Sequence, residues 1–284
     1  MRREPLLHGS LLLSGLAAVA ALLLIAVFIT REAWLALHEV GISRLLGDHG
    51  WFPAPDAGEG QFNLWPMLAG SVLVAVAAVM LAAPLGLAAV LFLHGLARPW
   101  QAAVLRRLLE LLAGIPSVVY GLWGLLVLVP WIQAWQPPGT SLLAGALVLA
   151  LMILPTVALF ADSALRQQPP ALRSAAAALG FTPWRTAISV LLPSSTRGVA
   201  AGVLLASGRA LGETLAMVMV CGNIVQVPTS LFDPVRTLTA NIALEMAYAM
   251  EAQRSALFAG GLLLLLLVAG LSLGARRAGG LSHA

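Results

Sequence analysis

The stretch that decides the fold is residues 111–161, with the sequence LLAGIPSVVYGLWGLLVLVPWIQAWQPPGTSLLAGALVLALMILPTVALFA and no charged residue. About 20 apolar residues are enough for a helix to cross a bilayer, so this stretch is too long for a single crossing. The segment QPPGT at residues 136–140 has the composition of a turn and divides the stretch in two. We therefore predict two membrane-spanning helices, over residues 111–135 and 141–163.

The rest of the chain contains further apolar runs of spanning length. They cover residues 9–30, 64–93, 198–224 and 256–275. The chain is 60% hydrophobic and only 10% charged, whereas about 25% of the residues in soluble domains are charged. Its mean hydropathy is +0.93. Because irregular backbone cannot face lipid, these runs predict an all-α, multi-pass membrane protein with six transmembrane helices.

The distribution of arginine predicts the orientation of these helices. All 16 basic residues are Arg, and there is no Lys. One side of the predicted spans carries Arg2, Arg3, Arg98, Arg106, Arg107, Arg166, Arg173, Arg185, Arg197, Arg276 and Arg277, and the other carries only Arg31, Arg44, Arg236 and Arg254. The positive-inside rule therefore places both termini in the cytoplasm, with the first run as a retained anchor in the bacterial inner membrane. Arginines dispersed between apolar runs favour this topology over nucleic-acid binding.

The numbers and spacing of lysine, cysteine and histidine argue against ATP hydrolysis by this chain alone, against a disulfide and against a metal site. Without Lys the chain has no Walker A loop, so it cannot hydrolyse ATP by that route alone. Cys221 is the single cysteine, which excludes an internal disulfide and a cysteine-based metal cluster. The five histidines show no metal-ligand spacing. We therefore expect no enzymatic activity, no metal and no cofactor.

The predicted cytoplasmic loop, residues 164–197, has local helix signals. Good helix formers occupy residues 171–179 after Pro169-Pro170, and Gly180 stands where a C-terminal capping glycine belongs. Thr182-Pro183 is typical of an N-cap followed by proline in the first helical position, and Pro193 is expected to end that helix. The loop therefore predicts two short helices outside the membrane, which either dock a partner or simply connect two spans.

The fifth apolar run contains an intramembrane arginine. Arg209 lies in the segment GRALGET at residues 208–214, and such a charge costs several kcal/mol unless it is paired or faces water. Glu213 follows four residues later, so we expect the two side chains to share a helix face and to pair. Two interpretations remain open. The pair either fixes helix packing, or Arg209 meets a passing anion while Glu213 limits how tightly it is held.

Three further polar side chains are candidates for the same pathway. Ser117 and Tyr120 place hydroxyls one helical turn apart beside Pro116, where a proline frees a backbone carbonyl. They either line the pathway or make interhelical hydrogen bonds. Asn223, at the outer end of the fifth run, is a candidate for its entrance.

The cytoplasmic loop resembles the EAA signature of binding-protein-dependent ABC importer permeases. The residues that match are Ser174-Ala175-Ala176, then Gly180 after three residues, and Val190-Leu191-Leu192-Pro193 after nine more. In that family this loop docks into a cleft of the ATPase subunit, which implies a coupling role for Ser174, Ala175, Ala176, Gly180 and Pro193. Ser174 stands where the family has Glu, and Val190 where it has Ile.

Three motifs resemble the PstC-type permease subunit of phosphate-specific ABC transporters. They are residues 208–214, GIPSVVYGLWG at 114–124 and SLFDP at 230–234, within a likeness that extends from about Trp51 to Arg254. The resemblance implies a type I ABC importer permease fold over residues 64–284, preceded by an anchor helix and periplasmic loop over 1–63. It also implies that Arg209 and Glu213 take part in phosphate translocation. The implied partners are a PstA-type permease subunit, an ABC ATPase dimer on the cytoplasmic side, a periplasmic phosphate-binding protein and membrane lipid, with no nucleic acid.

Other functions fit part of the same pattern. A permease for sulfate, molybdate or phosphonate would share the cytoplasmic loop, and a proton-coupled secondary carrier would share the intramembrane Arg209 and Glu213. A membrane-embedded enzyme would use Glu213 as a catalytic group, but it would normally need more convergent polar residues. Phosphate near neutral pH still carries a proton to give to a carboxylate, whereas sulfate does not. The chemistry therefore favours phosphate.

Overall fold

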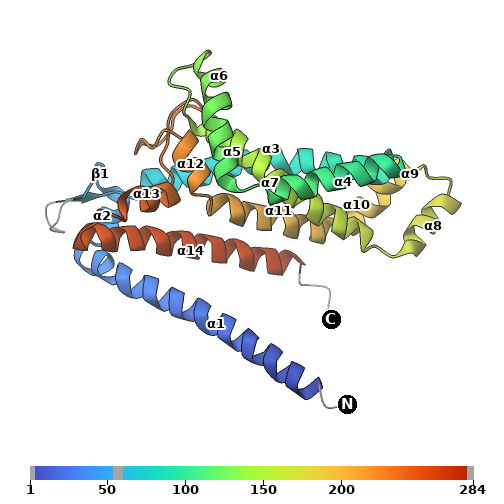
Figure 1. The fold of residues 1–284 in the computed structure, drawn as a ribbon, viewed down its shortest axis with the longest axis horizontal. Coiled ribbons are helices and arrows are strands. Elements are labelled where there is room, and N and C mark those ends of the chain that lie inside the picture. Colours follow the sequence, from blue (N-terminus) through green and yellow to red (C-terminus); the bar gives the residue numbers. More distant parts are fainter. Residues whose placement is uncertain (1–3, 54–59, 280–284) are drawn as a thin grey trace. The chain divides into compact units, whose positions relative to one another are not determined.

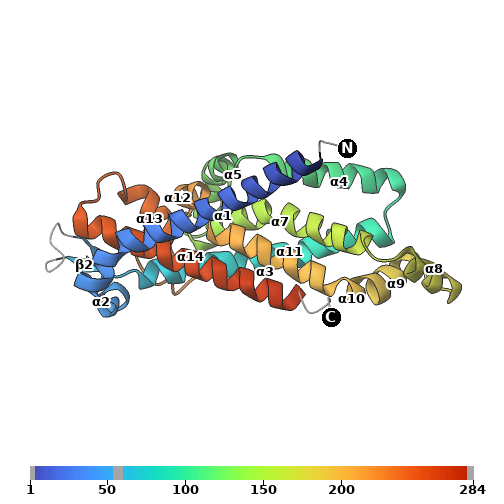
Figure 2. The same ribbon diagram turned by 90° about the horizontal axis from the view of Figure 1, so that it is seen from below.

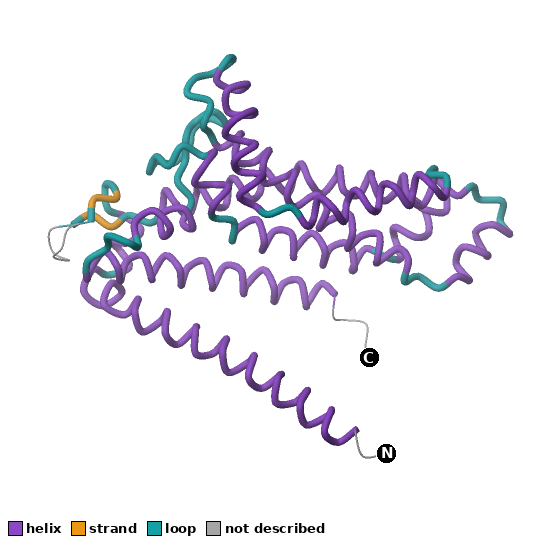
Figure 3. Tube along the Cα trace, viewed as in Figure 1, coloured by secondary structure: helices purple, strands orange, loops and turns teal. Residues whose placement is uncertain are grey.

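The computed structural model describes residues 4–53 and 60–279. Its internal contacts divide the chain into two compact units, Met1–Leu64 with Glu245–Leu265, and Trp65–Leu244 with Leu266–Ala284. Helices make up nearly all of both (Figures 1–3). The first unit contains α1 (Glu4–Leu35), the π-helical turn η1 (Ala36–Val40), α2 (Ile42–Gly47), β1 (Trp51–Phe52), β2 (Gln61–Phe62) and the start of α14 (Glu251–Gly279). The second contains α3 (Trp65–Gly95), α4 (Pro99–Gly114), α5 (Ser117–Trp123), η2 (Gly124–Leu128), α6 (Val129–Gln133), α7 (Leu142–Arg166), α8 (Pro170–Ala178), α9 (Pro183–Thr186), η3 (Ala187–Leu191), α10 (Leu192–Ser194), α11 (Thr196–Leu211), α12 (Leu215–Val220) and α13 (Leu238–Glu245).

The first unit is held together where the end of α1 meets the start of α14. Arg254 forms an ion pair with Glu32 at 3.3 Å, and Phe28 packs edge-on against Phe258 with ring centroids 5.7 Å apart. The Ser255 hydroxyl donates to the Glu32 carbonyl and accepts from the Ala36 N–H, at 2.7 and 2.8 Å. The short antiparallel pair β1–β2 lies in the same unit. These polar contacts tie two helices that are far apart in the sequence.

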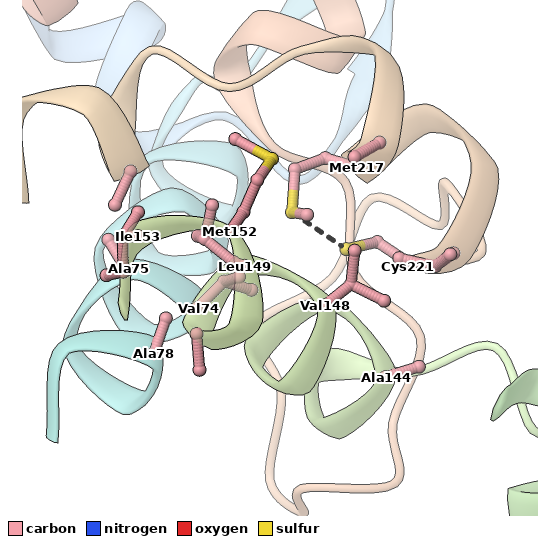
Figure 4. Close-up of a cluster of buried hydrophobic side chains, with 14 of the residues drawn as sticks. Val74, Ala75, Ala78, Ala144, Val148, Leu149, Met152, Ile153, Met217 and Cys221 are labelled. Atoms are coloured by element: carbon pink, nitrogen blue, oxygen red, sulfur yellow. Dashed lines mark hydrogen bonds between the residues drawn. The ribbon is translucent and has the colours of Figure 1, made fainter. Parts of the chain in front are cut away.

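The second unit is built around α3 and α7, which pack along each other. The buried face of α3 consists of small residues such as Ala75, Ala78 and Ala82, which let the helices approach closely (Figure 4). A Cβ atom at Gly86 would lie 3.1 Å from Val157 Cγ1, and one at Gly145 would lie 2.5 Å from Cys221 Sγ. Gly86 thus allows the close approach of α3 to α7, and Gly145 allows that of α7 to Cys221 at the end of α12.

Four helices of the described chain are long and apolar enough to cross a membrane: Leu11–Val40, Trp65–Gly95, Leu142–Arg166 and Glu251–Gly274. They confirm the helices predicted over 9–30, 64–93, 141–163 and 256–275. Two bent pairs could each form one more span, Pro99–Gly114 with Ser117–Gln133 at 93°, and Pro183–Ser194 with Thr196–Leu211 at 74°. The count of six spans and the cytoplasmic termini stay predictions.

The helix predicted over residues 111–135 is confirmed over residues 117–133, but its predicted start is wrong, because the chain turns sharply at Ile115-Pro116. Ile115 and Pro116 have extended backbones, with ψ of 129° and 142°. A proline disfavours the helical conformation in the residue before it, and it offers no N–H to the carbonyl four residues earlier, at Leu112. As a result α4 and α5 are separate helices at a steep angle (Figure 1).

The single helix predicted over residues 198–224 is also wrong. Helix α11 ends at Leu211 and α12 begins at Leu215. Gly212 occupies the C-cap of α11, and glycine is a poor helix former in this position of an otherwise apolar span. The break separates Arg209, in the last turn of α11, from Glu213.

The local helix signals of the predicted cytoplasmic loop are confirmed. Helix α8 covers Pro170–Ala178, and Gly180 follows it with a φ of +76°, which favours glycine. The Thr182 hydroxyl accepts from the Arg185 N–H at 3.2 Å and so caps the second helix. That helix continues as α9, η3 and α10 to Ser194, so Pro193 does not end it. Pro193 stands one residue before the last residue of this helix, and Ser195 is its C-cap.

Candidate translocation site

The break between α11 and α12 places the candidate arginine on the surface of the chain. Arg209 is exposed, and its only hydrogen bond in the described chain is a long one of 3.4 Å, from Nη1 to the Thr156 hydroxyl of α7. A hydrogen bond of this length is weak. Arg209 also lies within electrostatic range of Tyr120 on α5. Most of its five N–H groups therefore remain available to a ligand.

The candidate carboxylate has a different environment. Glu213 is only 9% exposed, and its Oε1 accepts from the Ala216 N–H at 3.2 Å, at the start of α12. Its carbonyl accepts from the Thr239 hydroxyl of α13 at 2.7 Å. The predicted Arg209–Glu213 ion pair is therefore wrong, because the break at Gly212 turns the carboxylate toward the α12 backbone. Glu213 does not neutralise Arg209 directly.

Ser117 and Tyr120 lie on the first turn of α5, directly after the Pro116 break. Tyr120 is buried, and its hydroxyl donates to the Leu112 carbonyl at 2.7 Å. Pro116 offers no N–H to that carbonyl, which accepts from the Ile115 N–H at 3.3 Å as well, so Tyr120 supplies the shorter of these two bonds. Ser117 is half-buried at the N-terminus of α5. Tyr120 is thus close to Arg209, but its hydroxyl is hydrogen-bonded within its own chain.

Asn223 lies beyond the far end of α12 from Glu213. Its φ is +56°, and its Nδ2 donates to the Val218 carbonyl at 2.7 Å. Its backbone N–H donates to the Val235 carbonyl, and its carbonyl accepts from Arg236 Nε at 2.9 Å. These bonds fold the following loop back onto α12. The structure therefore does not bring Asn223 into contact with Arg209.

The residues predicted to couple to an ATPase lie on α8 and the turn that follows it. Ser174, Ala175 and Gly180 are exposed, whereas Ala176 is buried against the chain itself. Pro193 is exposed on α10. The apolar side chain of Leu179 is 75% exposed beside them. Helix α8 thus presents a face of small and apolar residues that its own chain does not cover.

A buried charge cluster at the end of α7 was not found from the sequence. Asp162 contacts His94 of α3, Arg106 of α4 and Arg166 of its own helix, and His94 in turn contacts Arg173 of α8. The only available signal was that Asp162 is the first charged residue after the uncharged stretch and stands four residues before Arg166. Thr156, the partner of Arg209, carried no signal in the sequence.

Residues 82–277 match the family described as "Binding-protein-dependent transport system inner membrane component". The chain belongs to this family. It is 38% identical over 259 residues to "Probable ABC transporter permease protein YqgH" of Bacillus subtilis, covering 89% of this chain and 83% of that protein. It is 35% identical over 278 residues to "Phosphate transport system permease protein PstC" of Mesorhizobium japonicum, covering 87% and 82%.

A solved bacterial ABC transporter involved in the import of the acidic polysaccharide alginate has a similar fold. Its TM-score is 0.69 at 12% identity, over 100% of this chain and 98% of that chain, which shows the fold alone. These findings confirm the predicted all-α, multi-pass inner-membrane protein with the fold of type I ABC importer permeases. They also confirm the resemblance to PstC-type permeases, which are transport components.

Proposed function

We propose that this permease moves inorganic phosphate across the inner membrane as one subunit of an ATP-driven importer. Several relatives called phosphate transport system permease protein PstC support phosphate as the substrate, at 32–35% identity over most of the chain. The chain would carry no ATPase site of its own. A PstA-type permease subunit, an ABC ATPase dimer and a periplasmic phosphate-binding protein would complete the importer.

The exposed guanidinium of Arg209 is the observation that carries the proposal. An arginine at membrane depth must be paired or face water, because its charge is costly in hydrocarbon. Arg209 has one weak hydrogen bond and no ion pair within the described chain, and the carboxylate of Glu213 is turned away. The guanidinium matches the oxygens of a phosphate group in geometry and charge. Its position therefore supports brief contact with a passing anion.

Glu213 and the remaining candidates have supporting roles in this proposal. The carboxylate of Glu213 lies in the break that follows Arg209, so it repels an anion held near Arg209 and favours release, as a transport pathway requires. Ser117 provides a further hydroxyl beside Tyr120 at the start of α5, and Asn223 shapes the outer loop. The exposed face of α8, with Ser174 and Ala175, would dock the ATPase.

Uptake by the complete transporter tests the proposal. The complex with its partner subunits and binding protein is reconstituted in proteoliposomes, and ATP-dependent uptake of labelled phosphate and of sulfate is measured. We expect phosphate uptake that requires ATP and excludes sulfate. Arg209→Gln should abolish uptake while ATP hydrolysis continues, and Arg197→Gln, an exposed arginine at the other end of α11, serves as the matched control.

The other outcomes have distinct meanings. ATP hydrolysis without phosphate uptake by the wild-type complex would overturn phosphate as the substrate and point to another oxyanion. Phosphate uptake without ATP would indicate a secondary carrier. Loss of both uptake and hydrolysis in Arg209→Gln would show that Arg209 maintains the structure or the coupling and does not contact the substrate.

A further inference from the structure

The carboxylate of Asp162 is the centre of a cluster in which its own side chain is only 8% exposed. Arg106 binds it with two parallel hydrogen bonds, Nε to Oδ2 at 2.9 Å and Nη2 to Oδ1 at 3.1 Å. Arg166 Nε lies 3.0 Å from Oδ2, and His94 Nε2 lies 2.8 Å from Oδ1. A carboxylate has about four lone-pair sites, so these four contacts satisfy it completely.

His94 extends the cluster to α8. Arg173 Nη2 lies 3.2 Å from His94 Nδ1 and 3.5 Å from the Leu165 carbonyl. Arginine can only donate hydrogen bonds, so His94 Nδ1 must accept, and its proton lies on Nε2, from which it is donated to Asp162. The imidazole is therefore a neutral link that joins Arg173 of α8 to Asp162 of α7. Through Asp162 the chain of contacts reaches Arg106 of α4.

The cluster gives α8 a second connection to the candidate translocation site. The first is covalent, since α8 leads through α9, η3 and α10 to α11, which ends near Arg209. The second passes through the cluster to α4, and from α4 across the Pro116 break to α5. Helix α5 packs closely on α12, because a Cβ atom at Gly121 would lie 2.8 Å from the Ala216 Cα atom. The hydrogen bond from Tyr120 to Leu112 joins α5 to α4 as well.

From this geometry we infer that Asp162 and His94 are positioning residues that make α8, α4 and α7 move as one body. A movement of α8 then reaches the pathway from both sides, through α11 and through α5. Polar networks that are fully satisfied are rigid, and their bonds are directional, whereas apolar helix contacts can slide. The inference rests on the proposed function, in which α8 receives the motion of an ATPase.

Transport per ATP hydrolysed tests the functional half of the inference. Arg173→Met and Arg106→Met keep the aliphatic stems but remove the hydrogen bonds at the two ends of the cluster, and Asp162 keeps other partners in each variant. The matched control is Arg107→Met, because Arg107 is exposed on α4 and has no hydrogen bond or ion pair within residues 4–53 and 60–279. We expect Arg173→Met and Arg106→Met to import about fivefold less substrate per ATP, or lower still, with hydrolysis retained. The control should match the wild type.

A distance measurement tests the structural half without any transport. Nitroxide labels are placed by Ala103→Cys on α4 and Ala178→Cys on α8, two exposed positions, in a Cys221→Ala background. In the purified complex without nucleotide we expect a narrow distance distribution, which broadens with Arg173→Met and stays narrow with Arg107→Met. Equal distributions in all variants would overturn the inference, as would broadened distributions with unchanged transport per ATP.

The two measurements separate this inference from the proposed function. A wild-type complex that imports no phosphate, but whose label distances respond to Arg173→Met as expected, would overturn phosphate import and leave the mechanical link in place. A complex that imports phosphate with the same transport per ATP in Arg173→Met would leave the proposed function in place and overturn the role of Asp162 and His94.

Discussion

Two arginines of the second unit, Arg106 and Arg209, differ in how their hydrogen bonds are used. Arg106 binds Asp162 through two parallel bonds of 2.9 and 3.1 Å beside a histidine and a second arginine. Arg209 is exposed beside a helix break and, within the described residues, has a single weak contact with Thr156. The difference teaches that a charge satisfied by its own chain maintains structure, whereas one left unsatisfied is available to a ligand or partner.

The two helix breaks of the unit follow the same division. At Pro116 the Leu112 carbonyl, to which the proline offers no N–H, accepts from the Tyr120 hydroxyl and from the Ile115 N–H. At Gly212 the carboxylate of Glu213 accepts a hydrogen bond at the start of α12. Within the described residues, Arg209 keeps only its weak hydrogen bond to Thr156. We call the Pro116 break closed, because its polar groups are hydrogen-bonded within the chain. We call the Gly212 break open, because the guanidinium of Arg209 beside it is available to a ligand. Each of the following changes tests one side of this comparison.

The largest effect is expected at the open break. Replacing Arg209 by Lys keeps the positive charge but removes the planar guanidinium, which can donate two parallel hydrogen bonds to one oxyanion. We expect phosphate uptake by the complete transporter to fall by about tenfold or more, since one such bond to a charged group is worth about 1.5–3 kcal/mol. The melting temperature should not change, because Arg209 makes no strong contact with the described part of its own chain. A large loss of thermal stability would show that Arg209 maintains structure, as Arg106 does.

At the buried cluster around Asp162 we expect the opposite result, a loss of thermal stability. Asp162→Leu leaves Arg106, Arg166 and His94 without their common acceptor, and breaking a buried ion pair in this way costs about 3–5 kcal/mol. We expect a clear loss of thermal stability of the purified protein in detergent, measured by the fluorescence of its tryptophans. Glu32→Leu is the control, since the Glu32 ion pair with Arg254 is more exposed and longer, at 3.3 Å. Equal losses in both variants would contradict the special role of the buried cluster.

The sequence predicted most helices correctly because their signals are local. Apolar runs of spanning length identified α3, α7 and α14, and capping residues identified α8 and the helix that starts at Pro183. The Gly180 turn was predicted for the same reason, since a positive φ favours glycine whatever lies around it. Element type and approximate position could therefore be derived from composition and from residues a few positions apart.

The breaks and the partners of the charged residues could not be predicted, because tertiary contacts decide them. Hydropathy does not register a break inside an apolar run, so residues 111–135 and 198–224 were each predicted as one helix. The spacing of Arg209 and Glu213 indicates a pair only if the helix is continuous, and Gly212 ends it. Asp162 meets His94 and Arg106 from positions 68 and 56 residues away, a distance at which a single sequence carries no signal.

A smaller effect is expected at the closed break. Tyr120→Phe removes the hydroxyl and leaves the Leu112 carbonyl with only the longer bond from the Ile115 N–H, at 3.3 Å. The loss of one such hydrogen bond costs about 0.5–1.5 kcal/mol. We expect a moderate loss of thermal stability and looser attachment of α5 to α4, seen as faster hydrogen exchange in the first turn of α5. Tyr248→Phe is the control, because Tyr248 is 84% exposed. No difference between the two variants would show that the Pro116 break does not depend on this hydrogen bond.

The smallest effect is expected at Asp233, an exposed carboxylate that is satisfied locally. Its Oδ2 accepts from the N–H groups of Thr229 and Ser230 and from the Thr229 hydroxyl, at 2.7, 2.8 and 2.9 Å. These bonds, led by that from Ser230, lower the pKa of Asp233 below its ordinary value. A lowered pKa means that the charged carboxylate stabilises the turn above about pH 4 and that this contribution is lost as the pH falls through the lowered value.

Hydrogen exchange at the Thr229 and Ser230 amides measures this contribution directly. Near neutral pH both amides should exchange more slowly in the wild type than in Asp233→Asn, which has no charge to bind them. The difference should shrink as the pH falls through the lowered pKa of Asp233, because the wild-type carboxyl then becomes neutral as well. A difference that persists unchanged at low pH would mean that the shape of the turn, and not the charge of Asp233, protects the two amides. In that event hydrogen bonds to a charged group would not by themselves identify a structural role. Arg106 and Arg209 would then be distinguished only by how deeply each side chain is buried.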